Sequence, residues 1–132
     1  TNAARGWRLT GFTGPVLNGI KADLSDSPAL LPEGFGKRIN RVPAPDEEQG
    51  VWQRLGDGYE TGAVYPCVHG TMQWFALAGR AGGLYVGSHD PLHRAKRLSL
   101  RYDPATKRFG MAVTITCIPT ITLVPGWAAR RR

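Results

Sequence analysis

The amino-acid sequence predicts an all-β protein with the architecture of an antiparallel β-sandwich. Its 132 residues include 17 glycines and 10 prolines, which favour frequent turns and short strands over long helices. Apolar and polar residues alternate over 84–89 and 97–102, as is typical of strands with one buried face. The length suits one domain, so we expect a single domain over 1–126 and a basic tail over 127–132.

The first half of the chain carries the weaker strand patterns. Residues 6–12 and 15–20 predict two short strands interrupted by a Gly-Pro pair. The run 30–39 is apolar and then turn-like, and 51–55 fits either a short strand or a single helical turn.

The second half contains clearer strands. Residues 72–78 (MQWFALA) are apolar on both faces, which predicts a central strand covered above and below. After a tight turn at 80–83, the runs 84–89, 96–102 and 109–118 predict three antiparallel strands joined by short turns. The compact polar segment His-Asp-Pro-Leu-His lies between the first two of these strands.

The chain is basic, with 17 Lys and Arg against 10 Asp and Glu and a formal net charge of +7. Such a charge invites a nucleic-acid partner. However, three of the basic residues are the terminal arginines 130–132, and the others are scattered without helix-turn-helix, RNA-binding or zinc-finger patterns. We therefore expect a solvated basic face and no nucleic-acid partner. No stretch approaches the length needed to cross a bilayer, so we expect no membrane partner.

The two cysteines, Cys67 and Cys117, are far apart in the sequence and neither belongs to a CxxC pair. This spacing disfavours thioredoxin-like chemistry and a structural zinc site. In an exported protein the two would form one disulfide, and two buried thiols are the equal alternative.

Four blocks of the sequence carry a family resemblance: LLPEGFGKRINR, YPCVHGTMQWFALAGRAGGLYVGSHDP, KRLSLRY and VTITCIP. Over 7–119 the chain resembles a bacterial domain family of unassigned function that lies N-terminal to a barrel in glycoside-hydrolase-like proteins. The most specific part is 83–91. The resemblance implies a galactose-mutarotase-like β-supersandwich, here truncated and without the catalytic barrel. It also implies an extracellular or periplasmic location.

The histidines of the polar segment raise the question of a metal site. His89, Asp90 and His93 could supply three ligands, with His69 as a fourth. Pro91 between the two histidines argues for a loop, in which Asp90 caps the turn and His89 ends a strand. We favour this structural interpretation and expect no cofactor, and a divalent metal at the loop is the alternative.

Sugar binding needs exposed aromatic rings with polar neighbours, because the apolar face of a pyranose rests on a ring. Trp52 and Tyr59 flank a glycine-rich turn, so we expect them to be exposed. Trp74 and Tyr85 fall inside strands, where a core position is more common. The candidate carbohydrate-binding residues are Trp52, Tyr59, Trp74, Tyr85, His89 and Asp90.

A truncated supersandwich leaves strand edges with unpaired backbone groups, which are templates for another chain. We therefore expect a homo-oligomer, with the run 121–124 (ITLV) contributing to the contact. The alternative is a tail that folds back and closes the sandwich.

The sequence thus predicts a non-catalytic, carbohydrate-associated β-sandwich module that self-associates. One alternative is a small carbohydrate-active enzyme, related to glycoside hydrolases or metal-dependent through the loop 89–93. The other alternative is a purely structural self-assembling protein.

Overall fold

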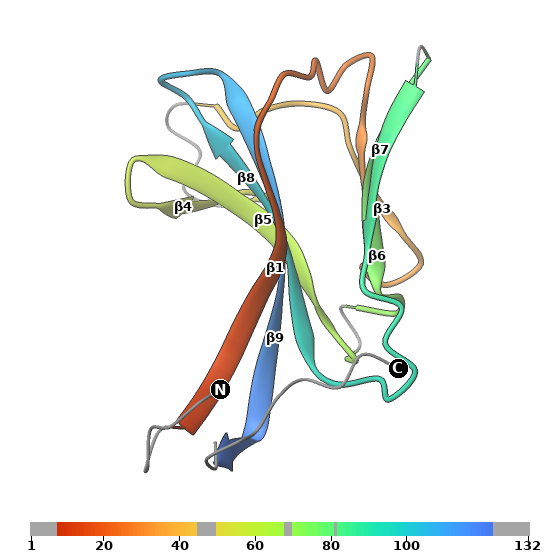
Figure 1. Ribbon diagram of the computed structural model, residues 1–132. Helices are drawn as coiled ribbons and strands as arrows, with labels where there is room; N and C mark the ends of the chain where they lie inside the picture. Colours follow the sequence, from red (N-terminus) through yellow and green to blue (C-terminus); the bar gives the residue numbers. More distant parts are fainter. Residues whose placement is uncertain (1–7, 45–49, 68–69, 81, 123–132) are drawn as a thin grey trace.

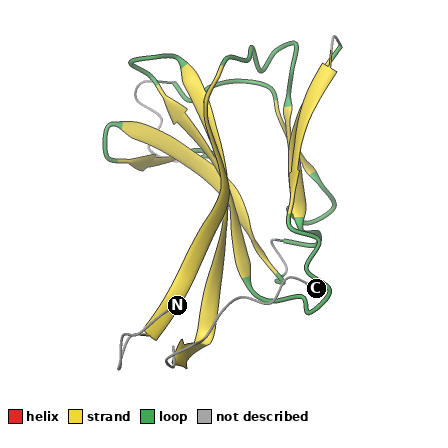
Figure 2. Cartoon of the chain, in the orientation of Figure 1, coloured by secondary structure: helices red, strands yellow, loops and turns green. Residues whose placement is uncertain are grey.

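The structure, a computed structural model, describes residues 8–44, 50–67, 70–80 and 82–122, with the side chains of 8–10 and 116–122 left out of the description. These residues form nine β-strands and no helix (Figure 2). The strands make two antiparallel sheets that face each other (Figure 1). The predicted antiparallel β-sandwich is therefore confirmed. No helix in the described part is long and apolar enough to cross a membrane. The predicted tail, 127–132, lies outside the described residues.

The sheets have five and four strands. The five-stranded sheet has the order β1 (Arg8–Ile20), β9 (Arg108–Thr122), β8 (Lys96–Asp103), β5 (Gly58–Tyr65) and β4 (Gln53–Leu55). The four-stranded sheet has the order β3 (Lys37–Ile39), β2 (Ala29–Leu31), β6 (Trp74–Gly79) and β7 (Gly82–Gly87). β1 and β9 continue together beyond the other strands as a two-stranded ribbon (Figure 1).

The core lies between the two sheets and follows the period-two pattern of the strands. In β8, Leu98 and Leu100 are completely buried, whereas Arg97 and Arg101 point to solvent, as their alternation predicts. Across from them the four-stranded sheet contributes its own inward-facing apolar side chains. The largest contributions to this buried cluster come from Trp52, Leu98, Leu100, Phe109, Met111 and Val113 on one side and Leu31, Phe75, Leu77 and Val86 on the other.

The prediction of three successive antiparallel strands is wrong for β7 and β8. β6 pairs with β7 and β8 pairs with β9, but β7 and β8 belong to different sheets. A two-residue turn joins β6 to β7 in the same sheet, whereas residues 88–95 are long enough to cross from one sheet to the other. The polar segment His-Asp-Pro-Leu-His is therefore a crossover between the layers of the sandwich.

The prediction that 72–78 is covered on both faces is also wrong. β6 begins at Trp74, and only Phe75 and Leu77, which face the other sheet, are buried. Trp74 and Ala76 are half-buried on the opposite face. This difference arises because no further layer covers the outer face of the four-stranded sheet in the described part of the chain.

In the first half, the two strands predicted around Gly14-Pro15 are one strand, β1. At the Gly-Pro pair the strand is not broken, but its pairing with β9 shifts register between Thr13 and Val16. The ambiguous run 51–55 ends in strand β4, and β5 was not predicted. The run 121–124, expected at an oligomer contact, reaches the end of β9 at Thr122, and its last two residues lie outside the described part.

Two leucines of the five-stranded sheet provide a matched test of this core. Leu100 in β8 is 0% exposed, whereas Leu55 in β4 is 55% exposed. We expect Leu100→Ala to lower the free energy of unfolding by about 2–5 kcal/mol, because it leaves a cavity between the sheets. Leu55→Ala should change it by about 0.5 kcal/mol or less. Urea unfolding followed by circular dichroism measures both, and equal effects would contradict the assigned core.

Candidate functional site

The crossover 88–95, here called the HDP loop, is held in place by a buried carboxylate. The Asp90 side chain is 5% exposed. Its Oδ1 accepts a hydrogen bond from the Leu92 N–H and its Oδ2 accepts one from the Arg94 N–H, both at 3.1 Å. Arg94 also donates from Nε at 2.9 Å and from Nη2 at 3.2 Å. Asp90 therefore has the turn-capping role that its position before Pro91 predicts.

These contacts lower the pKa of Asp90 far below its ordinary value. The hydrogen bonds from the Arg94 side chain are the main cause, and they outweigh the burial, which alone would raise the pKa. The backbone N–H groups of Leu92 and Arg94 and the Lys96 ammonium lower it further. Asp90 is thus an ionised structural group and not a carboxyl poised to exchange a proton.

A second cation reaches the loop from the interior. Lys96 is the first residue of β8, and its side chain is completely buried. Its Nζ lies 3.3 Å from Asp90 Oδ2, 2.5 Å from Gln73 Oε1 and 5.2 Å from the centre of the Tyr65 ring. The Lys96 ammonium therefore has a carboxylate, an amide oxygen and an aromatic face as partners, as a buried charge requires.

Gln73, just before β6, is hydrogen-bonded to Lys96, which follows the crossover, and to two residues of the crossover. Its Oε1 also accepts from the Asp90 N–H at 2.9 Å and from Ser88 Oγ at 3.1 Å, and its Nε2 donates to the Asp90 carbonyl at 2.9 Å. Gln73, Asp90, Arg94 and Lys96 are called the loop anchor below. The anchor joins β6, the HDP loop and β8, and it fixes the loop relative to both sheets.

The anchor orients the two histidines of the loop in different directions. Both have a left-handed backbone, with φ of 44° at His89 and 50° at His93. His93 Nδ1 is hydrogen-bonded to Tyr65 Oη and lies 3.2 Å from Gln73 Nε2. His89 Nε2 instead lies 2.8 Å from Tyr85 Oη. The two imidazoles therefore have separate partners.

This arrangement bears on the predicted metal ligands. Within the described residues, no group of three or more His, Cys, Asp and Glu side chains is placed to hold a metal. Asp90 is engaged by two cations, and His69 lies outside the described part of the chain. A divalent metal at the loop remains a prediction that the geometry of His89, Asp90 and His93 does not support.

His89 completes a row of three rings on the outer face of the four-stranded sheet. The Trp74 and Tyr85 rings are stacked with centroids 5.8 Å apart and an interplanar angle of 26°. The Tyr85 and His89 rings are stacked at 5.7 Å and 20°. Trp74, Tyr85 and His89 are called the aromatic row below. Tyr85 is 52% exposed, so the row is open to solvent.

Gly87 makes this stacking possible. It pairs with Trp74 across β6 and β7. A Cβ at this position would lie 2.7 Å from Tyr85 Oη and 3.0 Å from His89 Nε2, so the tyrosine ring would have to shift from its present position. A glycine between the tyrosine and the histidine is therefore required for the two rings to meet.

A groove of about 570 Å³ lies beside the aromatic row. Trp74 belongs to both features, because it lines the groove and stacks on Tyr85. The other groove residues come mainly from β2, β3 and the turn between them, and include Leu30, Pro32, Phe35, Arg38 and Met72. Arg38 lies in one cross-strand row with Leu30, Ala76 and Tyr85, so the cation and the aromatic rings share the outer face.

The predicted exposure of the aromatic candidates is reversed in the structure. Trp52 is 1% exposed, packs near Tyr102 and Phe109, and donates from Nε1 to the Arg41 carbonyl at 3.1 Å. Tyr59 faces the core in β5. These two are core residues, whereas Trp74 and Tyr85, expected to favour the core, lie on the open face.

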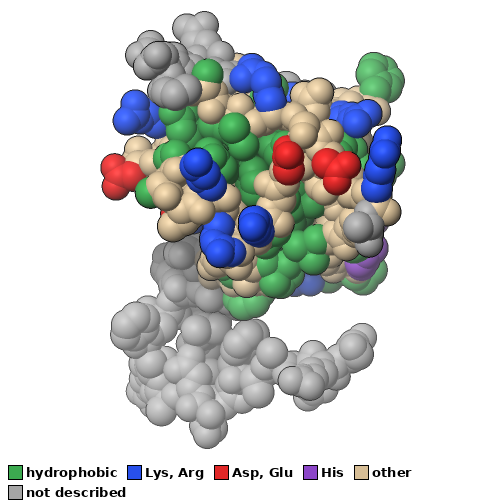
Figure 3. All heavy atoms as spheres, turned by 90° about the horizontal axis from the view of Figure 1, so that it is seen from above, with side chains coloured by type: hydrophobic (Ala, Val, Ile, Leu, Met, Phe, Trp, Pro, Cys, Tyr) green, Lys and Arg blue, Asp and Glu red, His purple; other side chains and the backbone are tan. Residues whose placement is uncertain are grey.

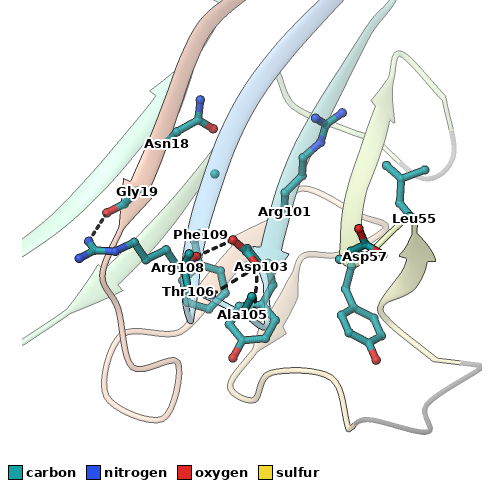
Figure 4. Close-up of a pocket in the computed structure, with 15 residues that line it drawn as sticks. Asn18, Gly19, Leu55, Asp57, Arg101, Asp103, Ala105, Thr106, Arg108 and Phe109 are labelled. Atoms are coloured by element: carbon teal, nitrogen blue, oxygen red, sulfur yellow. Dashed lines mark hydrogen bonds between the residues drawn. The ribbon is translucent and has the colours of Figure 1, made fainter.

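A larger groove, of about 1010 Å³, lies at one end of the five-stranded sheet (Figure 4). Three of its polar side chains make contacts that hold turns and strand ends. Asp103 accepts from the Ala105 N–H at 2.9 Å and from Thr106 Oγ1 at 2.6 Å, and Arg108 donates to the Gly19 carbonyl at 2.8 Å. Figure 4 shows these contacts as dashed lines along the groove wall. Asp103, Thr106 and Arg108 in this groove are therefore engaged in structural contacts.

The outer face of the five-stranded sheet carries a cluster that the sequence pattern did not reveal. Glu60 is buried beneath two arginines, with Oε1 2.6 Å from Arg97 Nη2 and Oε2 2.8 Å from Arg101 Nε. Burial alone would raise the pKa of Glu60, but the hydrogen bonds from Arg101 and Arg97 outweigh it and lower the pKa. The strand register brings the carboxylate and the guanidinium together, because Glu60 is directly opposite Arg101 in the pairing of β5 with β8.

The basic residues do not form one continuous patch on the face seen from above. There the Lys and Arg side chains are spread around the molecule, with hydrophobic and other side chains between most of them (Figure 3).

The predicted disulfide remains a prediction. Cys67 is exposed, and its Sγ lies 2.9 Å from the Val64 carbonyl oxygen. Cys117 is part of β9, but its side chain lies outside the described residues.

The fold and the site together define a small antiparallel β-sandwich that carries a loop-anchored aromatic row on the open face of one sheet. Comparison with known proteins matches this chain to no family model, no curated protein and no solved structure. The resemblance to a domain of glycoside-hydrolase-like proteins therefore remains a prediction from sequence motifs.

The loop anchor makes a testable contribution to stability. Because the pKa of Asp90 is lowered in the folded state from an ordinary value of 3.8, its ion pairs stabilise the fold above that pH and lose effect as the pH falls. We expect Asp90→Asn to lower the free energy of unfolding at neutral pH by about 3 kcal/mol, because Lys96 is left buried without its carboxylate. The difference from the unmodified protein should shrink below pH 4.

Asp103→Asn is the matched control, since Asp103 caps a turn at the surface and not in the interior. It should cost less than Asp90→Asn in urea unfolding at the same pH values. A difference between Asp90→Asn and the unmodified protein that stays constant from neutral pH to pH 2 would contradict the ionised role of Asp90.

Proposed function

We propose that this protein is a non-catalytic carbohydrate-binding module and that the aromatic row is its binding surface. The observation that carries the proposal is the exposed stack of Trp74, Tyr85 and His89 beside a groove on the open face of the four-stranded sheet. A pyranose offers an apolar face that packs on such rings, and its hydroxyl groups need polar neighbours.

The polar neighbours are close to the rings. The Tyr85 hydroxyl and the His89 imidazole end the row, and the exposed Arg38 guanidinium lies in the same groove as Trp74. These groups suit hydroxyl or acidic substituents at the rim of a sugar that rests on the indole.

The row is also held in place by hydrogen bonds within the chain. The loop anchor fixes the HDP loop, the loop fixes His89, and His89 is hydrogen-bonded to Tyr85. A preformed surface loses little side-chain entropy on binding, which favours measurable affinity from a small contact area.

The two buried carboxylates, Glu60 and Asp90, are engaged in structural ion pairs. Glycosidic hydrolysis usually needs two carboxyl groups facing each other across the sugar. The ionised Asp90 is paired with two cations inside the HDP loop, and Glu60 is paired with two arginines on the outer face of the other sheet. Neither of them is directed at the aromatic row. The expected extracellular or periplasmic location is part of this proposal, because polysaccharides are encountered there.

Substitution of Trp74 tests the proposal. We expect Trp74→Ala to weaken binding of an oligosaccharide identified on a glycan array by about tenfold or more, because the indole supplies the stacking surface. Isothermal titration calorimetry measures the affinity, and circular dichroism checks that the variant keeps its β-structure.

Leu55→Ala is the control, because Leu55 is an exposed apolar residue that lies on the other sheet. It should leave affinity unchanged. Absence of binding to any glycan on the array, or a Trp74→Ala variant that binds as well as the unmodified protein, would rule out this function for the aromatic row.

A further inference from the structure

The outer strands of the two sheets differ in how well their edges are protected from another strand. β1 contains Pro15 and three shifts of register with β9. β3 has three residues, two of which are Lys37 and Arg38, and β4 has three residues including the exposed Arg54. Proline, bulges, charge and short length are the devices that keep sheet edges from pairing.

Two internal stretches of edge are protected as well. The part of β9 that continues beyond β8 contains Pro119. The part of β5 beyond β4 is covered near Val64, where a Cβ on Gly70 would collide with the Val64 carbonyl and where Cys67 Sγ contacts the same oxygen.

β7 has none of these protections. It contains six residues, Gly82–Gly87, without a charge, a proline or a break in its register with β6. It is the last strand of its sheet, and among the described residues only β6 pairs with it. A regular, uncharged edge of this length is a template for an added strand.

The backbone groups available on this edge follow from the ladder with β6. The Ser88 N–H donates to the Gln73 carbonyl, so Ser88 and alternate residues before it face β6. Gly83, Tyr85 and Gly87 therefore direct their N–H and C=O groups away from β6. These three residues can accept a new strand without disturbing the existing sheet.

We propose that β7 pairs in an antiparallel manner with β7 of a second copy of this chain, about a two-fold axis at Tyr85. A two-fold interface places the same edge on both subunits, and β7 is the one described edge without protection. Its lack of charge matters, because each chain carries a formal net charge of +7 and the basic edge at β3 lies on the far side of the sheet. The occupant of this edge is therefore another β7.

The side chains of β7 suit this register. Tyr85 faces Tyr85 of the second copy, and Gly83 faces Gly87 of the second copy on either side. The glycines leave room for the two tyrosine rings on the outer face. On the inner face Leu84, which is only partly buried in one chain, gains a contact with Val86 of the second copy.

The pairing joins two four-stranded sheets into one continuous sheet with two aromatic rows on the same face. This consequence for ligand binding rests on the proposed function, but the pairing itself does not. A polymer that contacts both rows would bind with avidity that a single row lacks.

Sedimentation velocity over a range of protein concentrations tests the pairing. We expect the unmodified protein to reach twice the mass of one chain as the concentration rises. Tyr85→Lys should weaken the dimer by about tenfold or more, because it places two like charges opposite each other across the axis.

Trp74→Lys is the matched control. It also adds a lysine to the outer face and removes a stacking partner, but Trp74 lies in the internal strand β6. It should keep the dimer. An unmodified protein that remains monomeric, or equal dimerisation of the Tyr85→Lys variant and the unmodified protein, would overturn the proposal.

A second measurement covers the case in which Tyr85→Lys fails to fold. Photochemical dityrosine cross-linking of the unmodified protein should give a covalent dimer, because Tyr85 and its counterpart lie side by side. Tyr85→Phe keeps the ring and should remove the cross-link, whereas Tyr59→Phe, a buried tyrosine, should not. A cross-link that survives Tyr85→Phe would place the contact elsewhere.

Discussion

A lysine charge buried between two sheets constrains much of this structure. Lys96 starts the strand whose next inward-facing residues, Leu98 and Leu100, form the centre of the core. A buried ammonium must be neutralised and hydrogen-bonded. Asp90 and Gln73 meet that requirement, and they come from the crossover and from the opposite sheet. The charge pair therefore determines where the chain crosses between the layers and how the two sheets are placed at that end of the sandwich.

The buried ion pair also positions a residue at the surface, because the two are neighbours in the HDP loop. Asp90 is held inside, and His89, the residue before it, is held outside with a left-handed backbone against Tyr85. The His89 ring of the aromatic row is thus positioned through the loop by an interior ion pair, whereas Trp74 and Tyr85 are placed by strands β6 and β7. The absence of a side chain at Gly87 is the second requirement, because any Cβ there would separate the tyrosine from the histidine.

Local patterns in the sequence predict several strands of the second half of the chain, but not which strands are neighbours in a sheet. The alternation over 97–102 and the turn at Asp103 depend on residues close in sequence, and both are as expected. Whether β7 pairs with β8 depends on which sheet each joins, which no period of two encodes. The exposure of Trp74 and the burial of Trp52 have the same origin, since a strand pattern does not say which face another layer will cover. The contact of Lys96 with Gln73 also cannot be predicted from a local pattern, because Gln73 lies 23 residues before Lys96 in the sequence.

The two outer faces of the sandwich differ in chemistry, and this difference is the reason why we propose a binding surface on the four-stranded sheet. On the five-stranded sheet the ion pairs of Glu60 with Arg97 and Arg101 present solvated guanidinium groups, whose hydration a ligand would have to displace. The four-stranded sheet has rings and small residues at its centre and keeps its basic residues at the β3 edge. Removing water from such a face is favourable. The uncharged β7 edge belongs to this same sheet, so the proposed ligand surface and the proposed pairing edge depend on the same distribution of charge.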